Sequence, residues 1–329
     1  MVSRESDWEG VRLHVVTGKG GTGKTTVAAA LALALAGEGR RTLLVEVEGR
    51  QGIAQLFDCP PLPYEERKVA VGPGGGDVYA LAVDAEDALM EYLEMFYRLG
   101  RAGRGLRRIG AIDFATTIAP GTRDVLLTGK VYEAVRRKHG GQPVYDAVVL
   151  DAPPTGRITR FLGVNAEVAG LAKVGPIRSQ ADSIMGLMRS PMTAVHVVTL
   201  LEEMPVQETA DAVGELTAAG LPVGGIVVNG VRAPMLKQTD LAAAVKGRLD
   251  RDLVAKGLDA AGVGVPATAV DALLAGAAEH AERVALEKSE RRTLKALHRP
   301  MYELPLLVEG IDLGGLYVMA EQLCRQGMA

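Results

Sequence analysis

The chain contains very little cysteine, with only Cys59 and Cys324 among 329 residues. Neither belongs to a C-x-x-C pair or to the cysteine–histidine spacing of a zinc site, and two distant cysteines give no disulfide framework. Unpaired thiols suit a reducing compartment. We therefore expect a cytoplasmic protein without a disulfide scaffold.

Aromatic residues and excess charge are also scarce, at 4% of residues and a formal net charge of −3. The near-neutral balance argues against a general nucleic-acid coat, and few aromatics leave few platforms for stacking bases. No apolar run reaches the ~18 residues that cross a bilayer. The segment 1–10 is polar and acidic, unlike a secretory signal. We expect no specific nucleic-acid partner and no stable membrane insertion.

What the sequence does contain is an alternation of apolar runs and helical stretches. Several of the apolar runs are unbroken series of β-branched residues and leucine, which is typical of parallel strands buried on both faces. The alternation predicts an α/β protein with a doubly wound, mostly parallel sheet flanked by helices. The expected strands are 11–17, 42–47, 78–83, 144–150, 194–200, 223–228 and a short one before Pro305. The expected helices are 25–36, 85–97, 123–138, 206–219, 268–297 and 313–326.

The segment 18–25 reads G-K-G-G-T-G-K-T and matches the phosphate-binding loop template at every fixed position. It follows an expected strand and opens an expected helix. In such a loop the backbone N–H groups surround phosphate oxygens, Lys24 reaches the β- and γ-phosphates, and the Thr25 hydroxyl binds Mg²⁺. The sequence thus predicts an ATP/ADP and Mg²⁺ site that includes Gly18, Gly20, Gly21, Thr22, Gly23, Lys24, Thr25 and Thr26.

A second motif begins at Asp151, the last residue of an apolar strand-like run. A carboxylate at this end of a strand beside the loop is placed to hold Mg²⁺ through water. The following residues, D-A-P-P-T-G-R over 151–157, form a turn that prolines stiffen. The backbone of such a turn can respond to the γ-phosphate.

Lys19, an additional lysine that a plain phosphate-binding loop does not need, gives the form K-G-G-x-G-K-T. This form resembles the deviant Walker A ATPases. The segment 151–157 resembles the D-T-A-P-T-G-H switch II of their ArsA-like branch, which includes the arsenite-pump and tail-anchored-protein-targeting ATPases. The chain looks most similar to actinobacterial "anion-transporting ATPase" homologues. The resemblance covers nearly the whole chain, so we expect one P-loop ATPase domain over 1–329, with modest helical insertions at about 85–140 and 163–193.

The resemblance implies roles for four further residues. Lys19 is expected to cross a dimer interface to the partner's nucleotide, in a homodimer or a heterodimer with an ArsA-like homologue. Glu48 falls where the family's switch I, D-P-A-H, has the aspartate that orients the attacking water. Asn229 falls at the end of a strand where the family has an asparagine that hydrogen-bonds adenine. Pro305 lies in a segment similar to the family's adenine-facing loop.

The family's specialised sites are not reproduced. An arsenite site needs three neighbouring thiolates, which one chain with two cysteines cannot supply, so arsenite or other anion transport is not supported. The C-x-x-C zinc clasp of the targeting ATPase is also missing. Met185, Met188 and Met192 share a helical face that either packs in the core or binds hydrophobic clients, and Met90 and Met95 would extend such a surface.

Together these features predict a Mg²⁺-dependent dimeric switch that binds and hydrolyses ATP and couples its ATP state to a client or partner protein. One alternative is a scaffold or client carrier with slow hydrolysis or none. Another is a ParA-like partition ATPase, which needs a basic face. The sequence also has a basic stretch that is either a solvated face or a contact for an acidic partner or an anionic surface, and it contains Arg98, Arg101, Arg104, Arg107 and Arg108.

Overall fold

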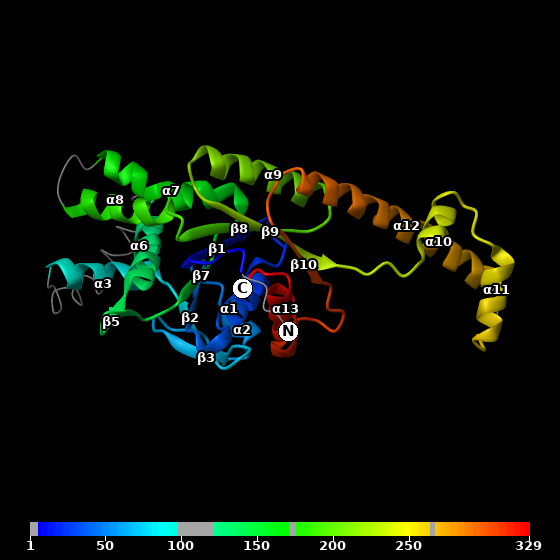
Figure 1. Cartoon of the computed structure of the whole chain (residues 1–329), viewed down its shortest axis with the longest axis horizontal. Coiled ribbons are helices and arrows are strands. Elements are labelled where there is room, and N and C mark those ends of the chain that lie inside the picture. Colours follow the sequence, from blue (N-terminus) through cyan, green and yellow to red (C-terminus); the bar gives the residue numbers. More distant parts are fainter. Residues whose placement is uncertain (1–5, 98–120, 172–175, 264–266) are drawn as a thin grey trace.

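The computed structural model describes residues 6–97, 121–171, 176–263 and 267–329. Its centre is an eight-stranded sheet of order β10-β9-β8-β1-β7-β2-β4-β3 (Figure 1). Every neighbouring pair is parallel except β3 with β4. The strands are β1 Leu13–Gly18, β2 Thr42–Glu46, β3 Arg67–Val71, β4 Asp77–Ala82, β7 Ala147–Asp151, β8 Thr193–Thr199, β9 Val223–Val231 and β10 Met301–Pro305. The predicted fold class is therefore confirmed.

Two structural features at the edges were not anticipated. β3 is antiparallel to its neighbour and largely exposed, so it carries none of the long apolar runs by which the other strands are found. A second, two-stranded sheet pairs β5 Lys138–His139 with β6 Gln142–Pro143. It forms a small turn between α6 and β7.

Both faces of the large sheet are covered, as the unbroken apolar runs require. On one face Leu44 and Val149 pack with α1 (Lys24–Leu35) and α13 (Leu313–Arg325). On the other face their neighbours Val45 and Leu150 pack with four further helices. These are α6 Thr122–Arg136, α7 Thr155–Leu171, α8 Pro176–Met188 and α9 Glu203–Ala218. The strand ends on the α1 face therefore lie beside the phosphate-binding loop.

The methionine face of α8 belongs to the core. Met185 and Met188 are 7% and 0% exposed, and Met192 is partly buried against the same cluster. The packing interpretation therefore holds for these three residues in this conformation. Met90 lies in α3 (Ala85–Tyr97) with intermediate exposure. The side chain of Met95 and the arginine stretch 98–108 lie outside the described residues.

Between β9 and β10 the chain forms a projection, of which the sequence pattern predicted only the long helix expected at 268–297. It consists of α10 (Gln238–Val245), α11 (Arg251–Ala260) and α12 (Ala267–Lys295), with α10 and α11 lying beyond the sheet against the distal part of α12 (Figure 1). The 29 residues of α12 give it a length of about 43 Å. A small apolar cluster that includes Leu241 and Ala281 holds α10 to α12.

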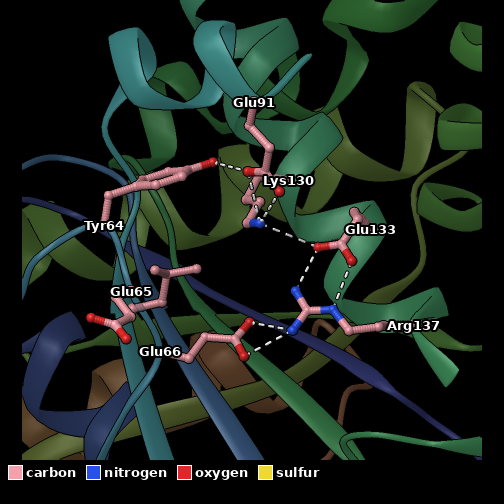
Figure 2. Close-up of a pocket in the computed structure, with 8 residues that line it drawn as sticks. Tyr64, Glu65, Glu66, Glu91, Lys130, Glu133 and Arg137 are labelled. Carbon is pink, nitrogen blue, oxygen red and sulfur yellow. Dashed lines mark hydrogen bonds and ion pairs between the residues drawn. The ribbon is translucent and has the colours of Figure 1, made fainter. Parts of the chain in front are cut away.

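A polar network fixes the segment that leads into β3 (Figure 2). It surrounds a hollow of about 300 Å³. The Tyr64 hydroxyl donates to Glu91 of α3 at 2.5 Å, and Lys130 of α6 pairs with the same carboxylate at 2.8 Å. Arg137 pairs with Glu66 at 2.8 Å. These contacts tie the segment after α2 (Gly52–Leu56) to α3 and α6.

None of the helices in the described ranges combines the length and the apolar character that crossing a lipid bilayer demands.

Candidate nucleotide-binding site

The glycine-rich loop joins β1 to α1. At two of its positions, Gly18 and Gly23, a larger residue would clash with neighbouring atoms. A Cβ at Gly18 would lie 2.2 Å from the Val198 carbonyl oxygen, and one at Gly23 would lie 2.4 Å from Asn229 Nδ2. Gly23 also has φ 85°, a conformation that L residues rarely adopt. At Gly20 and Gly21, by contrast, no atom lies within 4 Å of the Cβ position, and both are exposed. The outer part of the loop is therefore open to a ligand.

Thr25 and Asp151 meet at the inner side of this loop. Thr25 Oγ1 donates to Asp151 Oδ2 at 2.7 Å, and Asp151 is 8% exposed. Burial raises the pKa of Asp151 to about 6, against the Thr25 hydrogen bond and the charge of Lys24, which lower it. Asp151 Oδ1 is buried and has no hydrogen-bond partner among the residues that the structure describes. A hydroxyl beside a free carboxylate oxygen is a donor set that suits Mg²⁺, so these residues fit the expected ion.

Glu46, which the sequence reasoning did not single out, lies next to Asp151 at this site. It ends β2 directly opposite Asp151 in the strand register and is 2% exposed. Its Oε2 accepts a hydrogen bond from the Ile53 amide at 3.2 Å, while its Oε1 has no partner in the described part of the chain. The signal was present, because a carboxylate at the end of the run Leu43–Val45 must be buried, and buried acids are rare unless paired.

Glu48, the expected switch I acid, lies between two arginines. Its carboxylate is 3.7 Å from Arg50 Nη2 and 3.8 Å from Arg157 Nη1, and the side chain is 22% exposed. It lines a cavity of about 140 Å³ together with Arg123 and Pro153. The structure thus brings the expected switch I and switch II segments together at one cavity.

The side chain of Lys19 pairs with a helix outside the loop. Its Nζ lies 2.7 Å from Glu208 Oε1 on α9, and the two side chains are 31% and 35% exposed. Lys24 opens α1 and its charge acts on Asp151. The two lysines therefore have different surroundings. Thr26 follows in the first turn of α1 with intermediate exposure.

Asn229 braces the phosphate-binding loop from β9. Its Nδ2 donates to the Thr22 carbonyl oxygen at 2.9 Å, a contact that sequence spacing could not reveal. Pro305 ends β10, where it pairs with Val231 of β9. Asn229 and Pro305 therefore lie on neighbouring strands at the same side of the loop, and their expected contact with adenine stays a prediction.

A glycine loop between a buried strand and a helix, with a strand-end aspartate bonded to the loop threonine, defines a P-loop nucleotide-binding protein of the α/β class. The model of the ArsA family, described as "Anion-transporting ATPase", matches residues 11–192. The chain belongs to this family, so the resemblance drawn from the motifs is confirmed and the protein is an ArsA-family ATPase.

Individual relatives support the same assignment. The chain is 56% identical to "ATPase BagA" of Mycobacterium tuberculosis over 320 residues, covering 97% of this chain and 94% of the relative. It is 26% identical to "ATPase GET3" of Kluyveromyces lactis over 249 residues, covering 65% and 70%. It is 27% identical to an "Arsenical pump-driving ATPase" of Escherichia coli over 260 residues, covering 73% of this chain but 42% of that protein.

Proposed function

We propose that the protein is a Mg²⁺-dependent ATPase that works as a nucleotide-switched dimer and couples its ATP state to a partner or client protein. The observation that carries the proposal is the 2.7 Å hydrogen bond from Thr25 to Asp151, behind a loop whose glycines leave its outer part open. It supports a site where phosphates and a divalent cation are held together.

Each group at the site has a role in this proposal. Lys24 and the loop amides bind the phosphates, while Thr25 and Asp151 hold Mg²⁺. The ion, when bound, neutralises phosphate charge. Glu48 orients the attacking water or accepts its proton, and the cavity beside it is large enough for water.

The position of Lys19 supports the dimer. A lysine on the flank of the loop, paired with Glu208 while both side chains are about one-third exposed, can be redirected to a facing subunit. A cation delivered across an interface stabilises the charge of the transition state, as an arginine finger does. The facing subunit is a second copy or an ArsA-like homologue.

The alternatives gain less support. The methionine face is buried in the core, so a client carrier would need another surface or another conformation. The partition alternative needs a basic DNA-binding face, and the arginine stretch 98–108 lies outside the described residues. We therefore keep coupling of the ATP state to a partner protein as the proposed function.

Calorimetric titration with ATP and Mg²⁺ tests the nucleotide site. Lys24→Ala should abolish tight binding because the phosphates lose their fixed cation, while Lys138→Ala, an exposed lysine of β5, should bind like the parent. Equal affinity in Lys24→Ala and the parent would remove the assignment. Co-purification with an ATP-trapped variant then identifies the partner.

A further inference from the structure

Two buried carboxylates end neighbouring strands on the same face of the sheet. Glu46 and Asp151 are direct partners in the register of β2 with β7, where strands lie about 4.8 Å apart. Alternation along the strands puts both side chains on the side of Leu44 and Val149, which is the α1 side. The two acids are therefore side by side at the base of the phosphate-binding loop.

Each carboxylate has one oxygen engaged and one free. Thr25 donates to Asp151 Oδ2 and the Ile53 amide donates to Glu46 Oε2. The other two oxygens, Asp151 Oδ1 and Glu46 Oε1, are buried and have no partner within the described ranges. An unpartnered buried carboxylate oxygen is costly, and two like charges at this spacing repel each other. A bound cation would remove both costs at once.

From this arrangement we propose that Glu46 supplies a second carboxylate of the divalent-cation site, beside Asp151 and Thr25. The inference rests on the proposed nucleotide site. Within the described ranges, no group of three or more His, Cys, Asp and Glu side chains could hold a metal by itself. Two carboxylates and a hydroxyl suit Mg²⁺, which commonly takes its other ligands from water and nucleotide phosphates.

Glu46 also connects this site to the segment that carries Glu48. Glu46 accepts a hydrogen bond from the Ile53 amide, which belongs to the first turn of α2. This helix follows the loop that contains Glu48. Gly52 lies against Thr25, since a Cβ there would be 3.2 Å from Thr25 Cγ2. One carboxylate therefore contacts both the cation site and the Glu48 segment, so occupancy of the site stabilises that segment.

Glu46→Gln separates the two contacts, because the glutamine oxygen can still accept from Ile53 while the charge is lost. Mn²⁺ serves as the probe, measured by electron paramagnetic resonance on the ADP complex of the full chain. We expect Mn²⁺ affinity to fall at least tenfold in Glu46→Gln and ADP affinity without metal to stay within twofold. Asp77→Asn, a partly exposed acid at the start of β4, is the matched control and should bind Mn²⁺ like the parent.

The outcomes separate this inference from the proposed function. Parental Mn²⁺ affinity in Glu46→Gln, with normal binding by the parent, would overturn the role of Glu46 alone. A parent that binds neither ADP nor Mn²⁺ would overturn both.

Hydrogen exchange of the parent chain tests the same inference without depending on whether a variant folds. Adding Mn²⁺ to the ADP complex of the parent should slow exchange at the Ile53 amide at least fivefold relative to ADP alone. Unchanged exchange at Ile53 would overturn the link between the cation site and α2.

Discussion

Lys19 of the phosphate-binding loop forms an ion pair with Glu208 of α9 in its own chain, at 2.7 Å. Both side chains are about one-third exposed, and pairs of this kind contribute about 0–1 kcal/mol. Releasing the lysine therefore costs little compared with the charge-assisted bonds that a phosphate group offers. In the proposed dimer mechanism, the ion pair with Glu208 is therefore a weak contact that Lys19 can leave.

Lys19→Ala should leave nucleotide binding by the isolated chain within about twofold of the parent, because Lys24 already serves the chain's own phosphates. Hydrolysis or ATP-dependent assembly should fall at least tenfold. Light scattering with ATP, ADP and a non-hydrolysable analogue measures assembly, alone and with a candidate homologue.

Glu208→Gln is the matched control for this experiment. It frees Lys19 without removing it, so assembly with ATP should be retained or increased. A chain that stays monomeric under every nucleotide condition, with turnover indifferent to Lys19→Ala, would contradict the dimer mechanism.

Glu48→Gln should spare ATP binding and slow phosphate release at least tenfold, because an amide cannot accept the proton of the attacking water. The matched control Glu65→Gln changes an exposed acid in the segment before β3 and should retain parental turnover. Single-turnover phosphate release measures the effect. Equal rates in Glu48→Gln and the parent would move the role away from this carboxylate.

The parts of the molecule that follow from local pattern could be predicted from the sequence. The unbroken apolar runs specify a parallel sheet, and the spacing from Gly18 to Thr25 specifies the phosphate-binding loop. Contacts between distant segments could not be predicted. The bond from Asn229 to Thr22 depends on where β9 ends relative to the loop, and the pairing of Lys19 depends on the position of α9.

Strand register and the position of helices relative to the sheet also could not be predicted from the sequence. The importance of Glu46 comes from its position opposite Asp151 with a free oxygen, and sequence alone gives neither the register nor the missing partner. The helical pattern of α12 predicted a long helix, but amphipathicity does not say whether a helix covers the sheet or extends beyond it.

Asn229→Ala should weaken binding of both ATP and GTP by about 1 kcal/mol, which is about fivefold, because the loop loses its brace at Thr22. ATP should lose more than GTP, because the expected hydrogen bond to adenine is lost as well. Competition titrations with both nucleotides measure this effect. A selective loss for ATP would show that Asn229 contacts adenine as well. Parental affinity for both nucleotides would show that the brace is not needed.

A buried histidine pair lies between β1 and β8. His14 Nδ1 is 3.1 Å from His196 Nε2, and the Gly225 amide donates to His196 Nδ1 at 3.1 Å. Since His196 Nδ1 accepts, its Nε2 carries the proton and donates to His14 Nδ1. Both rings are thus neutral in the fold. Burial lowers the pKa of His14 to about 4 and holds the pKa of His196 well below its usual value, and the adjacent ring lowers the His196 value further.

This pair predicts a loss of stability as the pH falls from about 6.5 towards 5. In that range each unfolded imidazole binds a proton that the folded one does not, so the free energy of unfolding falls by up to about 1.4 kcal/mol per pH unit for each histidine. Urea unfolding at a series of pH values measures the slope. His14→Gln keeps an acceptor for His196 and removes one titrating group, so it should reduce the slope by about half the contribution of the pair. An identical slope in His14→Gln and the parent would show that His14 is not the group that titrates.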